Sequence, residues 1–292
     1  MAVYEHGYRP YAGRLTSSRS RLLTIPRYAY QDVFQSKIFV AFFATCFVPL
    51  LVEAIIIYLR HNLNALKVMN LSLANIVPID ASFFKIFLNI QDAFAFVLAV
   101  IIGPVLISRD LSNNALPLYL SRPFSRVEYV LGKTSVLLIL TSAVTWIPSL
   151  LIFLLQSGLE GGSWFADHLR IAFAIAASSW IWILVVSLLA IALSAWVKWR
   201  LAASAALFGI FMFPSVMGAL INQLFRTTWG DLINIGQMMS SVTSWLFTGE
   251  PEERLLPFPA HPVWVDWAVL MALCLVCLAI LWKKIRAYEV VR

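Results

Sequence analysis

Charged residues are scarce in this sequence. Asp, Glu, Lys and Arg make up 13% of its 292 residues, whereas hydrophobic residues make up 61%. Soluble domains carry about a quarter charged residues and about half apolar residues. A water-soluble fold of this composition would therefore lack the polar side chains needed to cover its surface. The composition predicts a membrane protein, and the length accommodates about six spanning helices of roughly 20 residues with their connections.

Cysteine and histidine are also few, with three and four residues. Cys274 and Cys277 form a C-x-x-C pair, but no second pair and no nearby His completes a set of metal ligands, so we predict no metal site. No His lies inside an apolar run, which argues against a membrane protease with a buried nucleophile. We therefore assign no catalytic residue.

Six apolar runs are long enough to cross a bilayer, and they predict an all-α membrane protein. Their approximate ranges are 38–59, 83–107, 129–155, 169–197, 201–220 and 263–282. Pro and Gly residues inside these runs do not exclude helices, because neighbouring helices and Ser or Thr side chains can satisfy the freed backbone groups. Only the short polar patch 197–200 separates the fourth run from the fifth.

The chain divides into a cytoplasmic tail with an interfacial helix at 1–37 and a six-helix membrane domain at 38–292. Ile25, Tyr28 and Val33 recur at helical spacing, which favours an amphipathic helix along the inner membrane surface. An ordinary polar run-in to the first span fits the pattern equally well.

The longest outer connection covers residues 221–262. It begins with apolar and amide residues and ends in a polar, Pro-rich stretch. Its apolar part either dips back into the membrane or lies on the outer leaflet.

The positions of the basic residues predict the orientation. With the amino terminus in the cytoplasm, most of the 22 Lys and Arg residues lie on the inner side: in the tail, at 109–133, at 198–200 and at the carboxyl terminus. Cytoplasmic loops carry such an excess, so we expect a multi-pass protein of the cell membrane, in bacteria the inner membrane, with both termini in the cytoplasm.

The net charge of +7 does not indicate a nucleic-acid partner, because the basic residues form no separate domain and collect where anionic lipid headgroups of the bilayer attract them. The sequence GKTS at 132–135 resembles the end of a phosphate-binding P-loop. That motif requires a Gly at the position of Val127. We therefore expect no ATPase site on this chain.

Two acidic residues lie inside the spans. Glu53 is in the first, and Asp92 is in the second, close to Asn89. Charged groups in hydrocarbon are costly and usually face a partner, a cavity or the bundle interior. One interpretation is a polar lining of a substrate path formed by these three residues. The other is a structural role, either a pair, for instance Asp92 with Lys85 or with a neighbouring helix, or simple proximity to the membrane interface.

Residues 109–133 form a polar, basic segment between the second and third runs. Asp110 or Ser112 is a candidate cap for a short helix ending near Leu120, and Pro117 limits its length. An S-R-P-x-S-R-x-x-Y-x-x-G-K pattern follows, formed by Ser121, Arg122, Pro123, Ser125, Arg126, Tyr129, Gly132 and Lys133.

This pattern resembles the permeases of ABC transporters of the ABC-2 class, and the six-span layout is similar over the whole chain. Asn113 and Asn114 stand where that family commonly has Gly-Thr. The resemblance implies that 109–133 contains a short cytoplasmic coupling helix that docks on a separate ABC ATP-binding subunit. The residues expected to take part are Asp110, Leu111, Asn113, Asn114, Leu116, Leu118 and Leu120, with Arg122 and Arg126 orienting the turn.

The same resemblance implies an exporter whose ATP and Mg are bound by the partner subunit, with no cofactor on this chain. It also implies pairing with a second copy or a sister permease. A secondary transporter or channel without an ATPase partner is the alternative. The substrate does not follow from the sequence.

Overall fold

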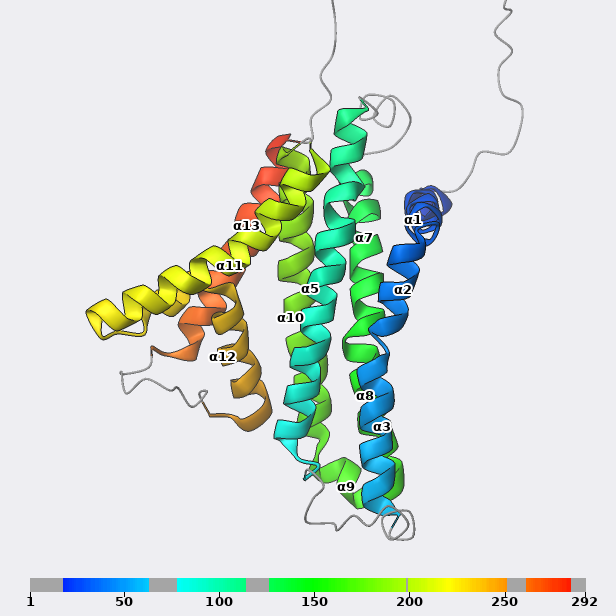
Figure 1. Cartoon of the computed structure of the whole chain (residues 1–292), viewed down its shortest axis with the longest axis vertical. Helices are drawn as coiled ribbons and strands as arrows, with labels where there is room; N and C mark the ends of the chain where they lie inside the picture. Colours follow the sequence, from blue (N-terminus) through cyan, green and yellow to red (C-terminus); the bar gives the residue numbers. More distant parts are fainter. Residues whose placement is uncertain (1–17, 63–77, 114–125, 198, 251–260, 285–292) are drawn as a thin grey trace, which may run out of the picture.

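The computed structural model describes residues 18–62, 78–113, 126–197, 199–250 and 261–284. Within these ranges the chain is helical and contains no strand, which confirms the all-α prediction (Figure 1). The elements in chain order are α1 (Ser18–Phe34), α2 (Lys37–Thr45), α3 (Val48–His61), α5 (Ala81–Ser112), α7 (Arg126–Val144), α8 (Trp146–Glu160), α9 (Gly162–Asp167), α10 (Leu169–Trp196), α11 (Arg200–Phe225), the 3-10 helix η2 (Trp229–Ile233), α12 (Ile235–Thr248) and α13 (Val263–Lys284).

Six helical stretches in the described ranges are long and apolar enough to cross a membrane, and they coincide with the six predicted runs. Four are single helices: α5, α10, α11 and α13. The other two are the pairs α2–α3 and α7–α8. The short connection near residue 198 does separate two spans, because α10 ends at Trp196 and α11 begins at Arg200.

Proline explains the two interrupted spans. α2 ends at Thr45, four residues before Pro49, and α7 ends at Val144, four residues before Pro148. A Pro has no N–H to donate to the carbonyl four residues earlier, and its ring clashes with that carbonyl. Each pair of helices is therefore one span with a break.

Pro104 lies inside α5 without ending it, because Ser side chains from two other helices satisfy the backbone. The carbonyl of Val100, which loses its helical donor to Pro104, accepts from the Ser204 hydroxyl of α11 at 2.9 Å. The Ser194 hydroxyl of α10 accepts from the backbone N–H groups of Ile107 and Ser108 and donates to the carbonyl of Pro104. α5 therefore remains one helix through Ser112.

α5 and α10 form the centre of the bundle. About two thirds of the most apolar windows of α5, α7–α8 and α10 are buried, against 17% for α2–α3, α11 and α13. The two central helices touch closely at Gly103, where an added Cβ would lie 2.6 Å from the Cβ of Ala190. Small residues at such contacts let membrane helices approach each other.

The segments predicted to be cytoplasmic gather at one end of the bundle: α1, the end of α5, the start of α7 and the end of α13 (Figure 1). α1 is a helix and packs against α7, whereas its position along the membrane surface stays a prediction. The predicted outer segment 221–262 contains the end of α11, η2 and α12. α12 lies alongside the bundle, in contact with α10, α13, α11 and α5.

We expect Gly103→Ala to lower the free energy of unfolding by about 1–3 kcal/mol, because the new methyl group overpacks the contact with Ala190. The measurement is thermal or denaturant unfolding of the purified protein in detergent. Gly209→Ala in α11 is the matched control: an added Cβ there meets no atom within 4 Å, so the change should stay within about 1 kcal/mol. Equal effects at the two positions would contradict the close packing of α5 on α10.

Candidate functional site

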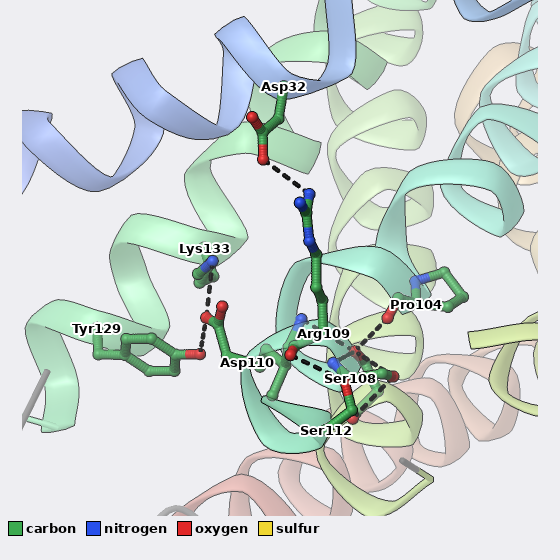
Figure 2. Close-up of polar contacts among 10 residues, drawn as sticks. Asp32, Pro104, Ser108, Arg109, Asp110, Ser112, Tyr129 and Lys133 are labelled. Atoms are coloured by element: carbon green, nitrogen blue, oxygen red, sulfur yellow. Dashed lines mark hydrogen bonds and ion pairs between the residues drawn. The ribbon is translucent and has the colours of Figure 1, made fainter. Parts of the chain in front are cut away.

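A buried ionic cluster lies where the two helices that flank the predicted coupling segment meet. Asp110 lies in the last turn of α5, and its Oδ2 atom accepts from the Tyr129 hydroxyl at 2.7 Å and from Lys133 Nζ at 2.9 Å (Figure 2). Tyr129 and Lys133 are one turn apart on α7, so they lie on the same face of that helix. We call these three residues the clamp, because they join the helix that enters the segment to the helix that leaves it.

The clamp is shielded from water. The side chains of Lys133 and Asp110 are 10% and 13% exposed, and Tyr129 is fully buried. A charge pair with so little solvent around it is held firmly, since removing one partner leaves an uncompensated buried charge. The side chain of Asp110 is therefore committed to α7 rather than turned outward.

A second ion pair connects the amino-terminal helix to the same place. Arg109 Nη1 donates to Asp32 Oδ2 of α1 at 2.9 Å (Figure 2). Both side chains are more than half exposed, so this pair contributes at most about 1 kcal/mol. This ion pair therefore adds little to the attachment of α1 to the end of α5.

Beneath the clamp, Ser108 and Ser194 anchor the end of α5 to α10. The Ser108 hydroxyl lies 3.1 Å from the Ser194 hydroxyl and donates to the Ser194 carbonyl at 3.2 Å. The end of α5 is thus bonded to α7 through the clamp and to α10 through these serines. Moving this end of α5 would require α7 and α10 to move with it or these contacts to break.

The structure places the predicted coupling residues unevenly. Asp110 is in the clamp, and Asn113 is exposed just after α5. Leu111 and Arg126 lie in α5 and α7, but their side chains, together with Asn114, Leu116, Leu118, Leu120 and Arg122, lie outside the described residues. The docking contacts stay a prediction. The predicted helix cap at Asp110 or Ser112 is wrong, because α5 continues through Ser112.

Tyr129 and Lys133 belong to the S-R-P-x-S-R-x-x-Y-x-x-G-K pattern, but the pattern by itself assigns them no role. Their spacing of four residues on one helix was the available signal. Nothing in the sequence indicated Ser194 or Ser204, which lie about 90 and 104 residues from their partners on α5.

A second candidate site is a pocket of about 420 Å³ lined by residues of α5, α10, α11 and α12. Two of the predicted path residues, Asn89 and Asp92, line it. Glu53 does not: it is buried on α3, which packs against α8. Lys85, the suggested structural partner of Asp92, donates to the Ser244 hydroxyl of α12 at 2.9 Å.

The fold and these sites define a class, a multi-pass all-α membrane protein with a braced polar segment at one end. Residues 28–284 match the family model described as ABC-2 family transporter protein, and the chain belongs to this family. It is thus a membrane-spanning permease subunit of an ABC transporter, and such subunits generally pair with ATP-binding subunits. A comparison with curated proteins gives no match.

We expect Lys133→Met to lower the free energy of unfolding by about 3–5 kcal/mol, since it leaves the Asp110 carboxylate buried without its cation. The double variant Asp110→Asn/Lys133→Met should recover part of this loss, because the charge itself is removed. A double-mutant cycle measured by unfolding in detergent reports the coupling between the two residues.

Arg109→Met is the control for the clamp variants. It breaks an exposed ion pair at the same end of α5 and should cost less than about 1 kcal/mol. Additive effects of the Asp110 and Lys133 changes would show that the two residues do not act as a pair.

Proposed function

We propose that this chain is the permease subunit of an ABC exporter, energised by a separate ABC subunit that binds ATP and Mg and docks on residues 109–133. The observation that carries the proposal is the clamp. It braces that segment at the end of the bundle where basic residues gather, in a chain that belongs to a family of transporter subunits.

The clamp suggests how movement of the partner reaches the membrane. Because Asp110 is bonded to Tyr129 and Lys133, a push on the segment acts on α5 and α7 together rather than bending a loose loop. The serine contacts then carry the displacement from α5 to α10. ATP closure would in this way move the central helices of the bundle.

We place the chain in the cell membrane with both termini in the cytoplasm, the bacterial inner membrane being the expected setting. The positive-inside distribution supports this orientation. A second copy or a sister permease completes the transporter. The apolar faces of α11, with Phe208, Phe213 and Leu224 exposed, offer surface for lipid or for that second permease.

A secondary transporter or channel is the second candidate, because a carboxylate from α5 faces a pocket within the spans. The two functions differ in their energy source. The first requires ATP and the partner subunit for transport in liposomes, whereas the second proceeds without either.

We expect Leu116→Asp to abolish co-purification with the ABC ATP-binding subunit that the proposal requires, because a charge in an apolar docking contact is left without a partner. Leu159→Asp is the matched control: it makes the same change on an exposed residue near the outer end of α8 and should bind as the wild type does. If the Leu116 variant retains the partner at wild-type levels, residues 109–133 are not the docking site.

A further inference from the structure

We propose that the pocket between α5, α10, α11 and α12 binds an organic cation with an apolar body, of the lipophilic ammonium or phosphonium class. This inference rests on the proposed function, since it names the cargo of the same transporter. The residues that carry it are Asp92, Phe96, Trp182 and Phe211, all of which line the pocket.

The described residues that line the pocket include one ionisable side chain. Asp92 is its only acidic residue among the described residues that line it, and none of those residues is Lys, Arg or His. The Oδ1 atom of Asp92 is buried and has no hydrogen-bond partner in the described part of the chain. A carboxylate at membrane depth is costly unless a cation or a polar group meets it. The described lining therefore offers this carboxyl no positive group, and a bound cation would supply one.

Three aromatic rings form an apolar wall next to this carboxylate. The centroids of Phe96 and Phe211 lie 4.5 Å apart, and Trp182 meets Phe211 edge-on at 5.6 Å. Trp182 Nε1 donates to the backbone carbonyl of Asp92 at 3.0 Å, which fixes the indole beside that residue. Aromatic faces attract organic cations and also bury their hydrocarbon groups.

The other lining residues suit a bulky ligand better than a metal ion. Met212 and Met239 add adaptable apolar surface, while Asn89, Gln237 and Thr243 supply amides and a hydroxyl. A small inorganic cation needs several oxygen ligands converging within about 2.6 Å, whereas here a single carboxylate faces aromatic walls. The volume of about 420 Å³ lies in the range of small-molecule sites.

The test measures equilibrium binding of radiolabelled tetraphenylphosphonium to the purified full chain in lipid nanodiscs, without any ATPase. We expect saturable binding by the wild type and at least a tenfold weaker affinity for Asp92→Asn, which keeps the shape and removes the charge. Asp92→Glu keeps the charge and should retain most of the affinity. Tetraphenylborate has the same shape and the opposite charge, and it should show no binding that depends on Asp92.

Glu53→Gln is the matched control, because it neutralises another buried carboxylate that lies outside the pocket, and it should bind as the wild type does. Size-exclusion chromatography checks that each variant is folded. If Asp92→Asn does not fold, Phe211→Leu removes one aromatic wall and should weaken binding severalfold. The proposal is overturned by wild-type affinity in a folded Asp92→Asn variant, by wild-type affinity in Phe211→Leu if Asp92→Asn does not fold, or by the absence of saturable binding by the wild type.

This outcome is separable from the proposed function. A chain that retains its ATP-binding partner but does not bind the cation refutes only the cargo class. A chain that binds the cation through Asp92 but is not retained by the ATP-binding subunit refutes the coupling and leaves the pocket assignment standing.

Discussion

The structure depends on the contact between α5 and α10, because α5 carries both candidate sites. Pro104 would interrupt α5 in hydrocarbon, where water cannot satisfy the freed backbone groups. Ser194 and Ser204 take over these hydrogen bonds, and Gly103 allows α10 to approach. α5 therefore runs unbroken from the pocket to the clamp, whereas α2–α3 and α7–α8 are broken near their prolines.

This continuity places the two sites on one helix. Asp92 and Asp110 stand on the same helix, about 27 Å apart at the usual rise per residue. The first lines the pocket, and the second is bonded to α7. One unbroken helix therefore connects the clamp to the pocket.

The spanning helices fall into a buried central group and an exposed peripheral group. α5, α7–α8 and α10 bury most of their apolar windows, whereas α2–α3, α11 and α13 bury few of theirs. In a bilayer such exposed apolar faces are satisfied by lipid and cost little. Of these peripheral helices, α11 leans away from the bundle in Figure 1 and also forms one side of the pocket.

The sequence by itself determined the membrane class, the six spans and the segment between the second and third of them, because hydropathy and charge sum along the chain and need no knowledge of packing. It also indicated Asn89 and Asp92 as pathway candidates, since a polar group in an apolar run is visible locally. The ion pair between Asp110 and Lys133 follows only from the tertiary structure. The same holds for the hydrogen bonds of Ser194 and Ser204 to the backbone around Pro104. It also holds for the position of Glu53 outside the pocket. Such partners lie on different helices, and the way those helices pack, rather than any local pattern, decides which of their side chains meet.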